Sequence, residues 1–153
     1  MGRINVRNFK SEPLETLELE DGKNWYLHRP TEESRHKVQV ALEDHDTRVE
    51  AYSEDLVARM EAARADAEAA GEDSPDDVAR KLSDADPVPL EVTPRYRAAA
   101  IVACHLRPVG LDPGVVLDEL GESLVNILFE RVTQETTGEA AKKVLAGPGL
   151  RGI

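Results

Sequence analysis

The sequence contains four histidines and a single cysteine, the residue types that most often hold metal ions or act as nucleophiles. The histidines are His28, His36, His45 and His105. No two of them form a His-x-x-x-His pair, and no short Cys/His metal-binding spacing occurs. Cys104 and His105 are adjacent, so on a helix their side chains point about 100° apart and cannot readily form a nucleophile–base pair. We therefore expect no metal site, no cofactor and no catalytic residue.

An acidic cluster around one histidine has the side chains that acid–base catalysis uses. It reads Glu43-Asp44-His45-Asp46. Successive residues of a helix fan around its axis, so these four do not converge on one substrate. We interpret His45 as a polar interruption of helix packing that fixes the register of the packing. Of the function classes that the sequence allows, a small enzyme with an unrecognised site is the least favoured.

The net charge of −11 is concentrated in the middle of the chain. Residues 31–93 hold 18 acidic and 7 basic residues, and the flanking segments cancel. Binding to a phosphate backbone depends on clustered Lys and Arg, so this charge argues against nucleic acid as a partner. No apolar run approaches the roughly 20 residues of a membrane span, and one cysteine cannot form an internal disulfide. We expect a cytoplasmic protein with no membrane contact.

The first 30 residues have the alternating apolar and polar pattern of short strands. The predicted strands lie near 3–7, 15–20 and 24–28. Alternation on both sides of Asp21-Gly22 is a strong signal for a hairpin, and we predict a type I′ turn with positive φ at both central residues.

One face of this predicted hairpin is apolar, and so small a sheet cannot leave it in water. Its residues are Leu17, Leu19, Trp25 and Leu27. Two alternatives follow. The face packs on the chain's own helices, which the usual bias of apolar residues toward the core favours, or it is the docking surface for a partner protein.

A single long helix is predicted over residues 31–70. Thr31 can cap its start, and Gly71 is a natural stop. At this length the helix would span roughly 60 Å, more than a compact domain of this size needs. It must therefore project from the domain or pair with another helix.

The apolar seam of this helix has heptad spacing, with steps of four and three residues. It reads Val38, Leu42, His45, Val49, Tyr52, Leu56, Arg59 and Ala63. We predict that the protein forms a homo-oligomer through this seam, in which Val49, Tyr52 and Leu56 contact another protein.

In the rest of the chain, helices are predicted to begin at prolines. The predicted elements are a short helix over 75–82, an extended connector over 84–94, an apolar helix from 94 to before Pro108, and a long helix that starts at Asp112-Pro113. The last two helices are expected to form an antiparallel hairpin at the centre of the core.

These patterns predict a mainly α fold with a small N-terminal antiparallel β-hairpin or sheet, a long central helix and a C-terminal helical hairpin. Within one domain, the expected parts are a β head at 1–30, an acidic helical middle and connector at 31–93, an apolar helical hairpin at 94–145 and a flexible tail at 146–153.

The segment that leads from the hairpin into the long helix reads Trp25-Tyr26-Leu27-His28-Arg29-Pro30-Thr31-Glu32-Glu33. With the strand pair before it and the Pro-bounded apolar helices after it, this segment resembles the small tail assembly chaperones of long-tailed bacteriophages, over about residues 14–60. The resemblance implies a helical, acidic, non-catalytic protein of the host cytoplasm. It also implies that the protein coats the tape-measure protein before tail-tube subunits polymerise around it.

Two features depart from that family: the Ala-rich charged stretch at 58–70 and the apolar terminus at Ile153. They keep a second function open, a permanent structural subunit of a phage particle or of another homo-oligomeric assembly. Such a subunit would reside in the virion and would bury the helix seam against a symmetric neighbour.

Overall fold

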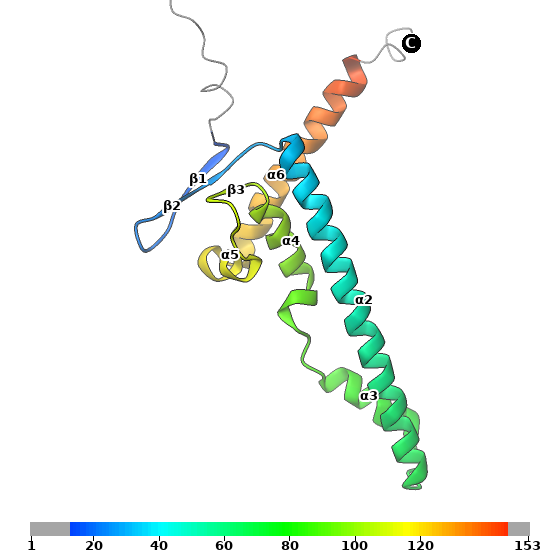
Figure 1. The fold of residues 1–153 in the computed structure, drawn as a ribbon. Coiled ribbons are helices and arrows are strands. Elements are labelled where there is room, and N and C mark those ends of the chain that lie inside the picture. Colours follow the sequence, from blue (N-terminus) through cyan, green and yellow to red (C-terminus); the bar gives the residue numbers. More distant parts are fainter. Residues whose placement is uncertain (1–12, 147–153) are drawn as a thin grey trace, which may run out of the picture.

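The computed structural model describes the backbone of residues 13–146 and the side chains of residues 13–136. It is mainly helical with a small three-stranded antiparallel sheet, as the sequence predicts (Figure 1). The elements in chain order are β1 (Glu15–Glu18), β2 (Asn24–Leu27), α2 (Glu32–Ala69), α3 (Pro75–Ala85), a short 3₁₀ helix η1 (Leu90–Val92), α4 (Pro94–Ala103), β3 (Leu106–Arg107), α5 (Pro113–Leu120) and α6 (Glu122–Ala146). The strand predicted near 3–7 and the tail beyond 146 lie outside the described residues.

The hairpin forms where it is predicted, but its turn differs. Leu17 pairs with Trp25 across β1 and β2, and the Leu19 N–H donates to the Lys23 carbonyl over 2.8 Å. The Gly22 N–H donates to the Leu19 carbonyl, and Gly22 alone in this turn has a positive φ, +84°. The predicted type I′ turn is therefore wrong, because it needs two consecutive positive φ values. The loop has three residues and places its glycine in the left-handed region.

A third strand, β3, completes the sheet on the far side of β2. The predicted helix from residue 94 to before Pro108 is wrong in its last part, because α4 ends at Ala103. Leu106 instead pairs with Leu27 and is only 1% exposed. Pairing with β2 buries Leu106 and gives its backbone hydrogen-bond partners. The resulting stabilisation outweighs local helix propensity, and it depends on a strand about 80 residues earlier in the sequence.

The predicted last long helix is two helices. Gly121 separates α5 from α6 with a φ of +82°, and its N–H donates to the Leu117 carbonyl over 2.8 Å. A glycine in the left-handed region ends a helix, whereas the apolar pattern continues through it and conceals the break. Both α5 and α6 pack on α4, and this packing forms the C-terminal helical unit.

The core lies between the sheet and the three C-terminal helices. Its buried residues are Leu19, Trp25, Leu27, Ala99, Val102, Leu106, Val116, Val125, Leu128 and Val132. Most of them are Leu and Val, as the low aromatic content of 4% requires.

The long helix α2 begins and ends as predicted. Thr31 and Ser34 form a capping box. The Ser34 N–H donates to the Thr31 side chain over 3.1 Å, and the Thr31 N–H donates to the Ser34 side chain over 2.7 Å. At the other end Gly71 has a φ of +75°. The far half of α2 extends away from the sheet and packs against α3 (Figure 1). The helix therefore both projects and pairs with another helix, and its partner α3 extends to Ala85 rather than to the predicted Leu82.

Candidate functional site

The apolar face of the hairpin lies in the core. Leu27 has no exposed surface, Trp25 is 5% exposed and Leu19 is also buried, while Leu17 is half-buried beside them. Packing on the chain's own helices is the arrangement that the structure shows. Buried side chains offer little or no surface to a partner, so of these four Leu17 keeps the most surface for docking.

The predicted contact residues on the α2 seam, Val49, Tyr52 and Leu56, are half-buried. The helix packs against α3, η1 and α4 of the same chain. Self-association through this seam stays a prediction, and it would have to use the surface that these three elements leave uncovered.

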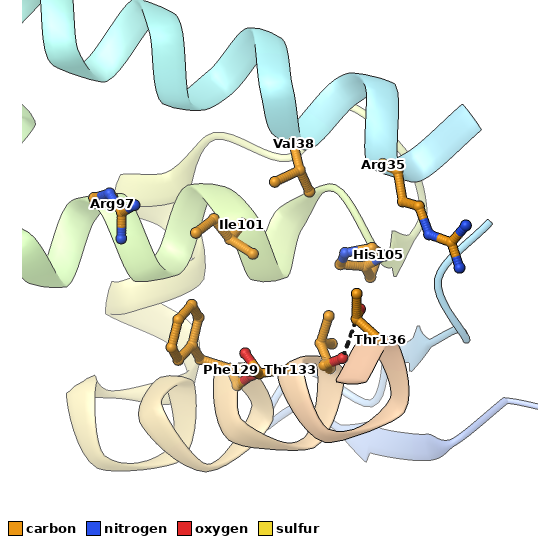
Figure 2. Close-up of a pocket in the computed structure, with 9 residues that line it drawn as sticks. Arg35, Val38, Arg97, Ile101, His105, Phe129, Thr133 and Thr136 are labelled. Carbon is orange, nitrogen blue, oxygen red and sulfur yellow. Dashed lines mark hydrogen bonds between the residues drawn. The ribbon is translucent and has the colours of Figure 1, made fainter. Parts of the chain in front are cut away.

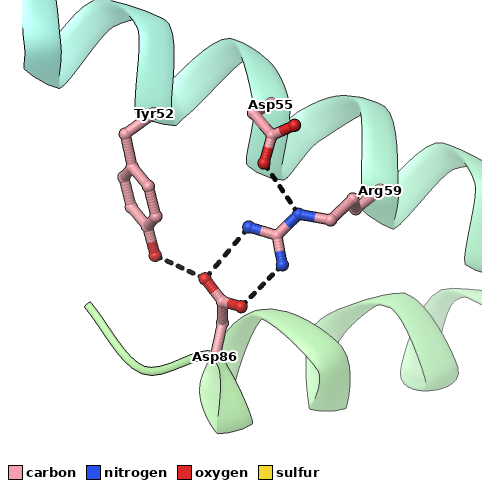
Figure 3. Close-up of polar contacts among 4 residues, drawn as sticks. All are labelled: Tyr52, Asp55, Arg59 and Asp86. Atoms are coloured by element: carbon pink, nitrogen blue, oxygen red, sulfur yellow. Dashed lines mark hydrogen bonds and ion pairs between the residues drawn. The ribbon is translucent and has the colours of Figure 1, made fainter. Parts of the chain in front are cut away.

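The end of α3 is tied to α2 by a polar cluster that we call the Asp86 cluster (Figure 3). The carboxylate of Asp86 accepts hydrogen bonds from Tyr52 Oη at 2.6 Å and from both terminal nitrogens of Arg59 at 2.6 and 3.1 Å. Arg59 Nε also donates to Asp55 at 2.9 Å. The Arg59 guanidinium, and after it the Tyr52 hydroxyl, lower the pKa of Asp86 to about 2. Every group is paired within the cluster, so its geometry suits holding α3 on α2.

His45 makes a second polar contact of α2. Its Nε2 lies 3.2 Å from the carbonyl oxygen of Thr93, the residue that caps α4, and the ring is buried. The neighbouring acids Glu43, Asp44 and Asp46 are exposed. This arrangement agrees with the interpretation of His45 as a polar contact that fixes how α2 packs, and the four residues do not converge on a site.

Cys104 and His105 also do not act on each other. The Cys104 thiol donates to the Ala100 carbonyl over 3.2 Å, and burial raises the pKa of that thiol. Burial, and after it the charge of Arg35, lower the pKa of His105 to about 4. Neither the thiolate nor the imidazolium that a nucleophilic pair would use is favoured. Within residues 13–136, no group of three or more His, Cys, Asp or Glu side chains could hold a metal ion.

A pocket of about 270 Å³ opens between α2, α4 and α6, with His105 in its wall (Figure 2). Its lining residues are Arg35, Val38, Arg97, Ile101, His105, Phe129, Val132, Thr133 and Thr136. These residues come from three separate parts of the sequence, and no local motif identifies them.

A groove of about 380 Å³ runs between β1 and α6, beside the edge of the sheet that β1 forms. The strand order is β1-β2-β3, and among the described residues β1 pairs with β2 alone. Leu17 and Leu124 line the groove with Ile127, which is 60% exposed. In the sequence, Ile127 is one of the apolar residues of the last predicted helix. This helix carries apolar residues around more than one face, which is the signal that some of them could be exposed.

No helix in the described part of the chain is long and apolar enough to cross a membrane. The comparisons with known proteins identify no relative: no family model matches the sequence, and no curated protein and no solved structure matches it.

Proposed function

We propose that this chain is a non-enzymatic protein-binding factor that acts in the cytoplasm as a tail assembly chaperone does. Its partners would be the tape-measure or tail-tube proteins that the resemblance of residues 14–60 implies. The observation that carries the protein-binding role is the groove between β1 and α6, where apolar surface lies beside a strand edge that none of residues 13–146 pairs with.

An exposed strand edge presents a row of backbone N–H and C=O groups that an extended segment can pair with. In this groove such a segment would also cover the exposed side chain of Ile127 and the remaining surface of Leu17. Backbone pairing would supply affinity, and the apolar groove would select an apolar side chain at alternate positions of the partner.

The charge beside the groove indicates which segments fit. Glu15 and Glu18 are exposed on β1, and Glu15 is 3.9 Å from Arg131 of α6. An acidic edge favours a partner segment in which basic residues alternate with apolar ones. The chain's charge of −11 would also keep such a complex soluble before assembly.

The test is co-purification of the chain with a co-expressed tape-measure or tail-tube protein. Ile127→Asp should reduce the recovered partner by at least about tenfold, since it places an unpaired charge in the groove. The matched control is Val57→Asp, which changes a valine that is 52% exposed on α2, far along the chain from the groove. Both variants should melt as the wild type does, because both sites are exposed.

Partner recovery that is equal for the wild type, Ile127→Asp and Val57→Asp would refute the groove as the binding surface. Sedimentation of the chain alone separates a transient binding factor from a permanent structural subunit. A stable homo-oligomer at low concentration would favour the subunit.

A further inference from the structure

The pocket between α2, α4 and α6 combines apolar walls with basic and polar groups (Figure 2). Val38, Ile101 and Phe129 supply apolar surface from three different helices. No acidic side chain is among the nine residues that line it. In a chain that carries 30 acidic residues, this is a surface with positive and apolar character.

His105 places in this pocket a buried ring nitrogen that has no hydrogen-bond partner among residues 13–136. The residue is 4% exposed, and its Nδ1 makes no hydrogen bond with any described residue. Buried polar atoms in native proteins nearly always have a partner, so this nitrogen gives the pocket wall a polar group that the described residues leave unsatisfied. The hydroxyls of Thr133 and Thr136 donate to helix carbonyls and keep oxygen lone pairs for a donor.

Arg97 supplies the charge. Its side chain lies on the exposed side of the pocket, in the first turn of α4, and it has no ion pair or hydrogen bond with the described residues. His105 follows the last turn of the same helix, so the two groups lie toward opposite ends of the pocket (Figure 2). A guanidinium prefers a planar anion, and a carboxylate is the smallest organic one.

We propose that this pocket binds a small carboxylate with an apolar body, whose acid group pairs with Arg97 while the body packs against Val38, Ile101 and Phe129. The pocket volume of about 270 Å³ is at the lower end for small-molecule sites. It suits one short aromatic or aliphatic acid, or the last residue of a polypeptide.

The test uses a matched pair of probes, 4-phenylbutanoate and 4-phenylbutan-1-ol, titrated into the full chain by isothermal calorimetry or NMR. The acid should bind saturably and at least about tenfold more tightly than the alcohol, since a charge-assisted hydrogen bond is among the stronger polar contacts. Arg97→Gln should abolish this difference and leave the affinity for the alcohol unchanged. The matched control is Arg95→Gln, which removes the same charge from an exposed residue of α4 outside the pocket lining.

Equal affinity for acid and alcohol, no saturable binding of the acid, or an acid preference that survives Arg97→Gln would each overturn the proposal. A further pair of probes identifies the source of the carboxylate, namely a tetrapeptide that ends in Phe with a free acid and the same peptide with an amide. Tighter binding of the free-acid peptide than of 4-phenylbutanoate would assign the site to a polypeptide terminus. Weaker binding would assign it to a free small acid. Neither result depends on the groove beside β1.

Discussion

The body and the arm of this protein are held together in different ways. The body consists of β1–β3 and α4–α6, and it encloses a cluster of buried apolar residues. The arm consists of residues 49–86, the far half of α2 with α3, and its buried residues are Ala67 and Ala79. The arm depends instead on polar contacts such as the Asp86 cluster. The acidic middle of the sequence corresponds to this thin part, where carboxylates remain in water.

Burial of large apolar side chains contributes a few kcal/mol each, whereas exposed ion pairs contribute about 0–1 kcal/mol. The arm should therefore open at a lower free energy than the body unfolds. The four predictions that follow test this difference, from the largest expected effect on the stability of the body to the smallest.

Replacing Trp25 by Ala should have the largest effect on the body. Trp25 is 5% exposed within the core cluster, so its removal opens a cavity and should cost about 3–5 kcal/mol. Chemical denaturation followed by circular dichroism measures this cost. Tyr26→Ala is the control, since the next residue is 38% exposed and should cost much less. Wild-type stability of Trp25→Ala would contradict the contribution of this face to the core.

The stability of the body should fall between about pH 6.5 and 4 because of His105. Burial and the charge of Arg35 lower its pKa from 6.5 to about 4. Between these values the unfolded chain binds a proton that the folded chain does not, so stability decreases as the pH falls, by at most about 3 kcal/mol. Denaturation at several pH values measures the slope. A slope that is unchanged in His105→Gln would assign the effect to another group.

The start of α2, which follows the sheet strand β2 and precedes the arm in the sequence, should contribute a smaller amount. The Thr31 side chain accepts the Ser34 N–H, and Thr31→Ala should cost about 1 kcal/mol. The control is Thr47→Ala on the same helix, where the hydroxyl donates to the Glu43 carbonyl and alanine has the higher helix propensity. Thermal melting should order the proteins with Thr31→Ala lowest. Equal melting of the two variants would mean that the cap contributes nothing.

What could be predicted from the sequence is the local part of the fold. The ends of α2 and the start of α4 follow from capping residues and from Gly71 and Pro94, which act on backbone groups within a few residues. What could not be predicted depends on distant partners. Leu106 is a strand residue only because Leu27 lies beside it. The break at Gly121 could have been found, since a glycine within a helical pattern marks a possible end.

The residues of the candidate sites were harder to predict from the sequence than the ends of the helices. Arg59 was predicted only as a position of the heptad seam, because its partner Asp86 lies 27 residues away, beyond the turn that joins α2 and α3. The pocket beside His105 is lined by residues of α2, α4 and α6. Which residues line it therefore depends on how these three helices cross. Apolar periodicity identified Trp25 and Leu27 as a face that must be covered, but it could not say whether the chain or a partner covers them.

Replacing Asp86 by Asn should leave the body unchanged and open the arm. The neutral side chain loses the charged contact with Arg59 and the preferred acceptor of the Tyr52 hydroxyl, so α3 should separate from α2 more often. Amide hydrogen exchange should become faster in α3 and stay as in the wild type in α4 and α6. Asp55→Asn is the control, since Asp55 is exposed and contacts Arg59 within one helix.

Because the pKa of Asp86 is lowered to about 2, its stabilising contribution is present above the unfolded pKa near 4 and is lost as the pH falls through 2. Below pH 2, the wild type and Asp86→Asn compared at the same pH should therefore exchange in α3 at similar rates. Faster exchange of α6 in the variant would show that arm and body unfold as one unit.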